Sequence, residues 1–302
     1  MNLSVTLAGV TLQNPVMTAS GTFGSGMEYA EMMDLNRLGA VVTKGVANVP
    51  WPGNPTPRVA EVTSGMLNAI GLQNPGIDTF TKRDLAFLTD YPKTKVIVNV
   101  CGRTAEDYVE VVERLADCPR VDMLEINISC PNVREGGIAF GQNPKAAETI
   151  TKAVKRVAAQ PVIMKLSPNV TDITEMAKAV EAAGADAVSL INTITGMKFD
   201  INRRTFALAN RTGGLSGPAI KPVAVRMVYQ TAHAVKIPVI GMGGIACAED
   251  AIEFLMAGAS AVSVGTANFH DPTVTLKIIE GIEAYMQRFG MKDVSEIRLK
   301  ED

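Results

Sequence analysis

Residues 127–132, with the sequence NISCPN, place one thiol between two asparagines where an apolar run ends. In a parallel α/β barrel, side chains at the carboxyl ends of the strands line the active-site mouth. A free cysteine more often acts as a small core residue. However, Asn127, Ser129 and Asn132 would each cost about 1 to 3 kcal/mol if buried without a hydrogen-bond partner. The segment therefore favours a ligand site, with Cys130 as the candidate nucleophile or base.

Short apolar runs alternate with helical patterns along the chain, which is typical of a parallel sheet covered by helices. Because the runs are almost continuously hydrophobic, both faces of the sheet should be buried, as in a closed barrel. The expected strands are residues 15–20, 39–45, 95–100, 123–129, 161–167, 187–193, 238–244 and 261–267. Amphipathic helices are expected at residues 105–116, 144–158, 173–183, 222–234 and 248–257. We predict an α/β fold, a (β/α)8 TIM barrel of eight strand–helix units in one domain, with a small hairpin at residues 4–12 closing its bottom.

Each expected strand ends in a polar residue or a glycine. These are Ser20, Lys44, Asn99, Asn127, Lys165, Asn192, Gly243 with Gly244, and Gly265 with Thr266. Parallel strands bring their carboxyl ends to one face of a barrel, so the set predicts a single site. The glycine pairs follow the last two strands, where barrels commonly bind phosphate through backbone N–H groups. The two lysines need an electron-rich partner at an apolar mouth, and a flavin ring that becomes anionic on reduction would be one.

Two long insertions, residues 46–76 and 194–218, follow the second and sixth strands. Long ordered loops at this end of a barrel usually bind substrate. In the first, backbone amides around Gly71 could bind a carboxylate, although the same glycine- and proline-rich stretch is equally consistent with a simple turn. Residues 133–141 are a plausible lid that would exclude water. Residues 21–26, GTFGSG, lack the dinucleotide-binding spacing and predict a turn at the barrel rim.

Composition excludes several classes of function. Lysine and arginine total 29 against 31 acidic residues, a net charge of −2, so no basic field exists for nucleic acid or an anionic membrane. Without a signal peptide or a long apolar span, the sequence predicts a soluble, cytoplasmic protein. The four cysteines and two histidines have neither disulfide nor metal-site spacing, so no metal is expected.

Motifs along nearly the whole chain resemble the dihydroorotate dehydrogenase family, specifically its class 1B, NAD-linked catalytic subunits. They are SGTFG (20–24), TKG (43–45), GNPTPR (53–58), GMLNAIGLQNPG (65–76), NVCG (99–102), EINISCPN (125–132), MKLSPN (164–169), INT (191–193), TGGLSGPAIKP (212–222), GMGGI (241–245) and VGTANF (264–269). Residues 46–55, with Trp51, are less regular than the family pattern, so no role is predicted for them.

This resemblance implies FMN-dependent oxidation of (S)-dihydroorotate to orotate in pyrimidine biosynthesis. Cys130 would take the C5 proton, and flavin N5 would accept hydride from C6. The implied FMN contacts are Ser20, Lys44, Gly45, Asn99, Asn127, Lys165, Ile191, Gly217, Gly243, Gly244, Gly265 and Thr266. The implied substrate contacts are Lys44, Asn68, Ala69, Ile70, Gly71, Leu72, Asn127, Asn132, Asn192 and Thr193.

The sequence also predicts a partner subunit. It has no dinucleotide-binding loop and no iron–sulfur cysteine spacing, so NAD reduction needs an external relay. The resemblance implies a partner carrying FAD and a 2Fe-2S cluster, in a heterotetramer built on a homodimer of this chain. Four alternatives remain: a fumarate-linked class 1A enzyme, a dihydropyrimidine dehydrogenase-like barrel, a non-redox Schiff-base barrel using Lys165, and a non-catalytic scaffold. The last two leave the strand-end residues partly or wholly unused.

Overall fold

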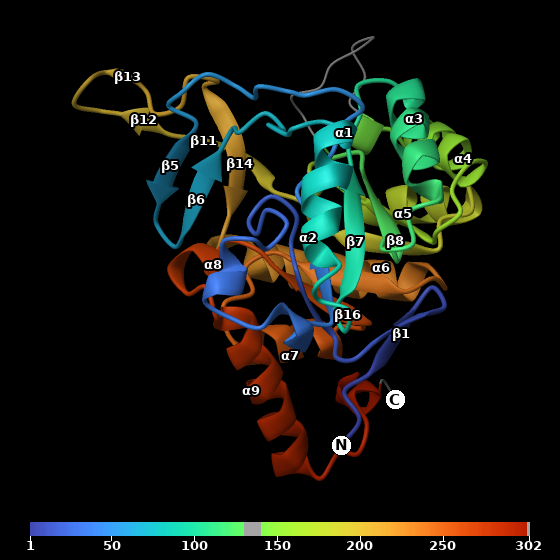
Figure 1. Cartoon of the computed structure of the whole chain (residues 1–302). Helices are drawn as coiled ribbons and strands as arrows, with labels where there is room; N and C mark the ends of the chain where they lie inside the picture. Colours follow the sequence, from blue (N-terminus) through green and yellow to red (C-terminus); the bar gives the residue numbers. More distant parts are fainter. Residues whose placement is uncertain (130–139, 301–302) are drawn as a thin grey trace.

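The computed structural model describes residues 1–129 and 140–300. Its centre is a closed barrel of eight parallel strands, each paired with the next along the chain and the last paired with the first. The strands are β3 (Val16–Thr18), β4 (Ala40–Val42), β7 (Lys95–Val100), β8 (Met123–Asn127), β9 (Val162–Lys165), β10 (Ala187–Leu190), β15 (Val239–Met242) and β16 (Ala261–Val264). The predicted (β/α)8 TIM barrel is therefore confirmed (Figure 1).

Helices cover the outside of the barrel. They are α3 (Ala105–Ala116), α4 (Pro144–Lys155), α5 (Ile173–Ala182), α6 (Lys221–Ala234), α7 (Ala248–Met256) and α9 (Val274–Phe289), with the short α8 (Ala267–His270) before the last. Side-chain caps fix where several begin: Thr104 caps α3 with Asp107 in a capping box, Asn143 caps α4, and Asp172 caps α5. These polar caps satisfy backbone N–H groups that have no partner within the helix.

The first two strand–helix units depart from the predicted repeat. Between β3 and β4 the described residues form only two 3-10 turns, η1 (Tyr29–Glu31) and η2 (Leu35–Arg37). Asp34 accepts a hydrogen bond from Asn36 N and so begins the second turn. After β4, one continuous helical stretch runs through α1 (Ile77–Thr79), the π-helical η3 (Phe80–Leu85) and α2 (Ala86–Leu88). The expectation of eight strand–helix units is thus wrong for the first unit, where the segment that connects β3 to β4 contains no α-helix.

The lower half of the barrel interior is apolar and is closed by the N-terminal hairpin. Strands β1 (Val5–Leu7) and β2 (Val10–Leu12) pair antiparallel, as predicted. Leu7 and Leu12 are fully buried in one cluster with inward residues of the barrel strands, among them Met17, Ile97, Met123, Ile163 and Ile240. Because these residues precede the carboxyl ends of their strands, the hairpin closes the opposite end of the barrel from the mouth.

We expect Leu12→Ala to lower the free energy of unfolding by about 2 to 5 kcal/mol, because it opens a cavity in this fully buried layer. Urea unfolding measures the loss. The dependence of the unfolding free energy on urea concentration should be the same in the variant and the wild type. Thr11→Ala, at an exposed position of the same strand, is the matched control and should change stability by no more than about 0.5 kcal/mol. Equal effects of the two substitutions would show that the hairpin does not plug the barrel.

The two long insertions form a sheet rather than independent loops. Strands β5 (Val59–Val62) and β6 (Gly65–Asn68) come from the first insertion, and β11 (Ile194–Met197) and β14 (Thr212–Ser216) from the second. They pair antiparallel in the order β11-β14-β6-β5, and a small hairpin of β12 (Phe199–Asp200) and β13 (Thr205–Phe206) extends from them. Figure 1 shows this sheet at the upper left, standing at one end of the barrel. The two insertions, although distant in sequence, thereby form one continuous sheet, which we call the insertion sheet.

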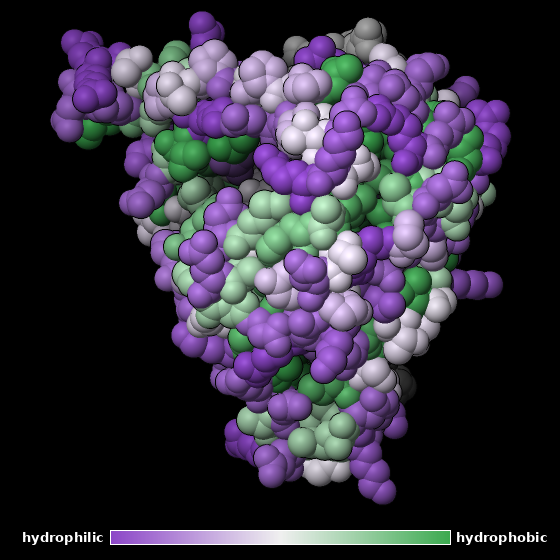
Figure 2. All heavy atoms as spheres, viewed as in Figure 1, coloured by the Kyte–Doolittle hydropathy of each residue, from purple (hydrophilic) through white to green (hydrophobic). Residues whose placement is uncertain are grey.

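Figure 2 shows hydrophilic side chains over much of one face, with hydrophobic residues in scattered groups between them. Within residues 1–129 and 140–300, no helix is both long enough and apolar enough to cross a membrane.

Candidate active site

A cavity of about 1070 Å³ lies at the carboxyl ends of the barrel strands, beneath the insertion sheet. Its size suits a ligand as large as a mononucleotide cofactor with a small substrate. All the described residues that sequence analysis assigned to cofactor or substrate line it: Ser20, Lys44, Gly45, Asn68, Ala69, Ile70, Gly71, Leu72, Asn99, Asn127, Lys165, Ile191, Asn192, Thr193, Gly217, Gly243, Gly244, Gly265 and Thr266. Cys130, Asn132 and residues 133–139 of the expected lid lie outside the described residues.

The pleat of the strands explains why polar groups meet at this end. Successive side chains point to opposite faces, so every second residue enters the barrel. Along β8, Met123 belongs to the lower apolar layer, Glu125 follows, and Asn127 reaches the cavity. Register places Glu125 beside Asn99 of β7, Asn127 beside Lys165 of β9, and Lys165 beside Ser189 of β10. The interior thus changes from apolar to polar toward the mouth.

Lys165 is a buried cation in the cavity wall. Its side chain is 5% exposed, its Nζ donates a hydrogen bond to Ser20 Oγ at 3.1 Å, and Glu125 Oε1 lies 3.7 Å from Nζ. The Ser129 hydroxyl donates to the Lys165 carbonyl at 2.7 Å, which ties β9 to the residues just after β8. A buried charge is tolerated only when paired and hydrogen-bonded. These contacts therefore fix the ammonium group at the cavity wall.

Asn99 presents an unsatisfied acceptor beside the cavity. Its Nδ2 donates to Glu125 Oε1 at 2.6 Å, whereas its Oδ1 has no hydrogen-bond partner among the described residues. A Cβ atom on Gly45 would lie 2.8 Å from that Oδ1, so a side chain at position 45 would clash with this oxygen. Buried acceptors in folded proteins rarely stay unpaired. A ligand N–H is the simplest partner for it.

The glycine pair after β15 brings backbone close to helix α6. Gly244 has φ +83°, and a Cβ atom there would lie 2.8 Å from Lys221 N, so a side chain is excluded. Lys221 Nζ donates to Asp250 Oδ1 and Glu253 Oε2 at 2.7 Å each, and these bonds raise the pKa of Lys221. The ion pairs join α6 to α7 and hold the glycine turn in place.

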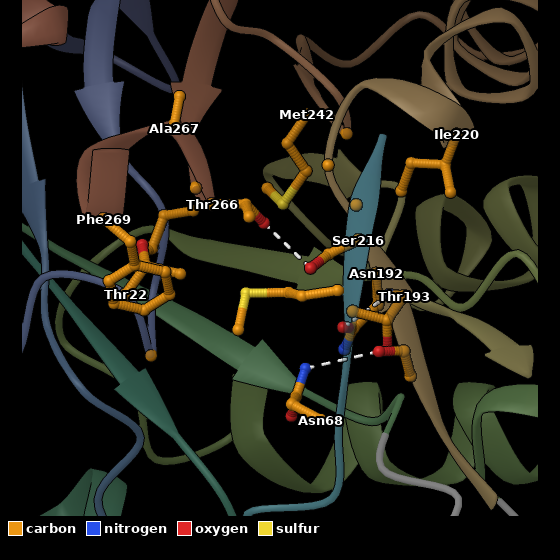
Figure 3. A pocket seen from close by; sticks show the side chains of 18 of the residues that line it. Thr22, Asn68, Asn192, Thr193, Ser216, Ile220, Met242, Thr266, Ala267 and Phe269 are labelled. Atoms are coloured by element: carbon orange, nitrogen blue, oxygen red, sulfur yellow. Dashed lines mark hydrogen bonds between the residues drawn. The ribbon is translucent and has the colours of Figure 1, made fainter. Parts of the chain in front are cut away.

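The insertion sheet closes the cavity from above. In Figure 3, Thr266 and Ser216 point toward each other, and Thr266 Oγ1 donates to Ser216 Oγ at 2.8 Å. Asn68 lies near Asn192 and Thr193 in the same view, and its Nδ2 lies 3.4 Å from the Gly214 carbonyl oxygen that accepts its hydrogen bond. Residues from both insertions therefore face the strand ends of the barrel across one cavity.

The irregular segment around Trp51 braces the loop that follows β6. Trp51 and Asn74 exchange backbone hydrogen bonds of 3.0 and 3.1 Å, and Asn54 Nδ2 donates to Ala69 O at 2.9 Å. The Arg103 guanidinium stacks 4.9 Å from the Trp51 ring centroid. The segment for which the sequence predicted no role thus holds residues 68–72 against the cavity.

Sequence reasoning missed three residues that build this site: Glu125, Ser189 and Ser216. Glu125 had a signal, because a charged residue inside an apolar strand must be paired when it is buried. Ser189 Oγ donates to Glu125 Oε2 at 2.9 Å, yet a serine in a strand is common and gives no such signal. Ser216 reaches the cavity only through the pairing of the two insertions.

Comparison with known proteins gives a consistent family. The family model for dihydroorotate dehydrogenase matches residues 2–286. A protein of Lachnoclostridium phytofermentans named dihydroorotate dehydrogenase B (NAD(+)), catalytic subunit, is 68% identical over 297 residues, 98% of each chain. Proteins of the same name are 62% identical in Alkaliphilus metalliredigens, over 99% of this chain and 98% of the relative, and 58% identical in Geobacter sulfurreducens, over 98% and 97%. The chain therefore belongs to the dihydroorotate dehydrogenase family and resembles its NAD(+)-linked B-type catalytic subunits over almost its full length.

Proposed function

We propose that this chain is the catalytic subunit of an NAD-linked dihydroorotate dehydrogenase, a single FMN-binding barrel domain that oxidises (S)-dihydroorotate to orotate in pyrimidine biosynthesis. The observation that carries the proposal is the single cavity at the barrel mouth, which gathers every described residue assigned to flavin or substrate. Membership of the family supports the same reaction.

The residues around the cavity fit a flavin. The unpaired Asn99 Oδ1 suits an N–H of the ring, and the Lys165 ammonium suits the part of the ring that gains negative charge on reduction. Gly243, Gly244, Gly265 and Thr266 follow the last two strands, the usual phosphate position in such barrels. When bound, FMN would supply the hydride acceptor for the reaction.

Cys130 is the proposed base that removes the C5 proton of the substrate. It follows Ser129 directly, and Ser129 is anchored to β9 by its hydrogen bond to Lys165 O. A cysteine thiol free in water has a pKa of about 8.5, so nearby donors and cations must stabilise the Cys130 thiolate for useful rates near neutral pH. The Cys130 thiolate would take the proton from C5, and the bound flavin would supply the acceptor for the hydride that leaves C6.

Asparagine amides would orient the substrate for this step. Asn68 of β6, Asn127 of β8 and Asn192, just after β10, line the cavity, and Asn132 is a fourth candidate outside the described residues. An amide side chain both donates and accepts, which suits the alternating N–H and C=O groups of the dihydroorotate ring. Lys44 and the backbone of residues 69–72 would bind its carboxylate. Such positioning lowers the barrier by removing orientational freedom before reaction.

The proposal is tested first by the cofactor. Protein purified without added flavin should be yellow and should release close to one FMN per chain on denaturation. A colourless protein that cannot be loaded with FMN would defeat the proposal. Trapping of a carbonyl substrate on Lys165 by borohydride would instead support the non-redox Schiff-base alternative.

We also expect the isolated chain to form NADH from NAD and dihydroorotate only slowly. Rapid NADH formation should require a partner subunit that carries FAD and a 2Fe-2S cluster. The sequence lacks both a dinucleotide loop and cluster spacing, so a flavin in this cavity needs a relay. Dihydroorotate-dependent NADH formation would be followed with and without the partner, with fumarate as a second acceptor. Rapid NADH formation without a partner would contradict the two-subunit arrangement, and preference for fumarate would indicate class 1A. Sedimentation of the active mixture tests the expected heterotetramer.

A further inference from the structure

Glu125 is a buried acid directly beneath the cavity. It lies in β8 between Met123, in the lower apolar layer, and Asn127, in the cavity wall, and it is 2% exposed. A carboxylate at such a depth is costly unless every oxygen has a partner. The proposed reaction gives Glu125 no part, since it does not line the cavity.

The partners of Glu125 come from three other strands of the barrel, the adjacent β7 and β9 and the next strand, β10. Oε1 accepts from Asn99 Nδ2 of β7 at 2.6 Å and lies 3.7 Å from Lys165 Nζ of β9, and Oε2 accepts from Ser189 Oγ of β10 at 2.9 Å. A carboxylate only accepts hydrogen bonds, so the Asn99 amide must turn its nitrogen toward Glu125. That orientation leaves Asn99 Oδ1 as the unpaired acceptor.

We propose that Glu125 is a positioning residue whose carboxylate orients Asn99 and holds Lys165 at the cavity wall, and whose charge sets the reduction potential of the bound flavin. This inference rests on the proposed function. If residue 125 were apolar, Asn99 Nδ2 would lose its hydrogen bond to Glu125 and Lys165 Nζ would lose its ion-pair partner. Both Asn99 and Lys165 line the cavity. Glu125 thus acts on the ligand only through these two residues.

The direction of the charge effect follows from the ion pair. Lys165 stabilises negative charge on a reduced ring, and the Glu125 carboxylate offsets part of that field. In a buried site such interactions are weakly screened, so loss of one charge is felt strongly. Removal of the Glu125 charge should therefore raise the reduction potential.

Glu125→Gln is the direct test. The glutamine oxygen can still accept from Asn99, and its amide can donate to the Ser189 hydroxyl, so the shape is retained while the charge is lost. The flavin of the holoprotein is reduced photochemically beside a reference dye, which requires neither substrate nor partner. We expect at least a tenfold shift toward reduced flavin, about 30 mV for a two-electron couple.

Glu280→Gln is the matched control. Glu280 pairs with Arg37 at 2.8 Å on the exposed face of α9, with 58% of its side chain exposed, so the same charge is removed where solvent screens it. The flavin reduction potential of the Glu280→Gln variant should equal that of the wild type. A potential in Glu125→Gln that also equals the wild type, with FMN fully bound, would overturn the inference.

A double variant covers the case in which the single variant fails to fold. Glu125→Gln with Lys165→Met removes both charges and leaves no unpaired buried ion. Its potential should lie between those of the two single variants, because the charges oppose each other. If neither the single nor the double variant folds, Glu125 is a structural residue of the barrel and the inference is wrong.

The outcomes separate this inference from the proposed function. Wild-type flavin that dihydroorotate cannot reduce would defeat the proposed function, whatever the potentials. Wild-type flavin that dihydroorotate reduces, with a potential insensitive to Glu125→Gln, would defeat only the role of Glu125.

Discussion

Cys130→Ala should slow the reduction of bound FMN by dihydroorotate about 10²- to 10⁴-fold while leaving the flavin bound. The rate loss corresponds to about 3 to 5 kcal/mol of activation free energy. The reason is that the C5 proton then has no positioned base, whereas the groups proposed to hold the flavin are unchanged. Rapid mixing without oxygen measures the reduction step separately from reoxidation.

Two further variants make this prediction specific. Cys130→Ser should give an intermediate rate, since a hydroxyl has the right place but is a poorer base. Cys118→Ala is the matched control: Cys118 lies after α3, away from the cavity, and burial raises the pKa of its thiol, so it should react at the wild-type rate. The wild-type rate should rise with pH through the Cys130 pKa and then level off. Near-wild-type reduction in Cys130→Ala at neutral pH would remove Cys130 from the mechanism.

Lys165→Ala should weaken FMN retention and lower the flavin reduction potential. Lys165 is a buried cation of the cavity wall, and beside a bound flavin its charge would stabilise the reduced ring more than the oxidised ring. The substitution also leaves Glu125 buried without its cationic partner, which should cost about 3 to 5 kcal/mol of stability. Thermal unfolding and a dye-coupled reduction measure the two effects.

Lys165→Met separates charge from packing, because it keeps most of the side-chain stem. Its potential should fall as far as that of Lys165→Ala, with smaller loss of packing. Lys152→Met, which breaks an exposed pair with Glu148 on α4, controls for loss of a lysine and should change neither potential nor stability measurably. An unchanged potential in flavin-replete Lys165→Met would contradict the placement of Lys165 beside the flavin.

Local sequence patterns predicted the parts of the fold that local interactions determine. The helix expected at residues 105–116 coincides with α3, because Thr104 and Asp107 form a capping box at its start. The expected strand at residues 123–129 contains β8, and the pairing of Leu7 with Val10 confirms the N-terminal hairpin. The polar strand ends also predicted that these residues gather at one cavity, since parallel strands must bring their carboxyl ends together.

Features that depend on distant pairing could not be predicted in this way. The insertion sheet exists because Gly214 pairs with Asn68 across 146 positions, and neither strand has a pattern that specifies the other. The brace of Trp51 on Asn74 has the same origin. The missing first helix reflects a short segment in which turn contacts replace helical ones. The sequence could have pointed to Glu125, because it is a charged residue within an apolar strand. It could not have identified the three residues that contact Glu125.

Anaerobic mixing of the isolated, FMN-loaded chain with (S)-dihydroorotate tests the central claim most directly. The cavity gathers the described residues that we assign to flavin and substrate, so the flavin absorbance should bleach in a single turnover without NAD or a partner. Orotate should form in an amount equal to the flavin reduced. Flavin that stays oxidised with dihydroorotate, yet is reduced by dithionite in the same sample, would contradict the account.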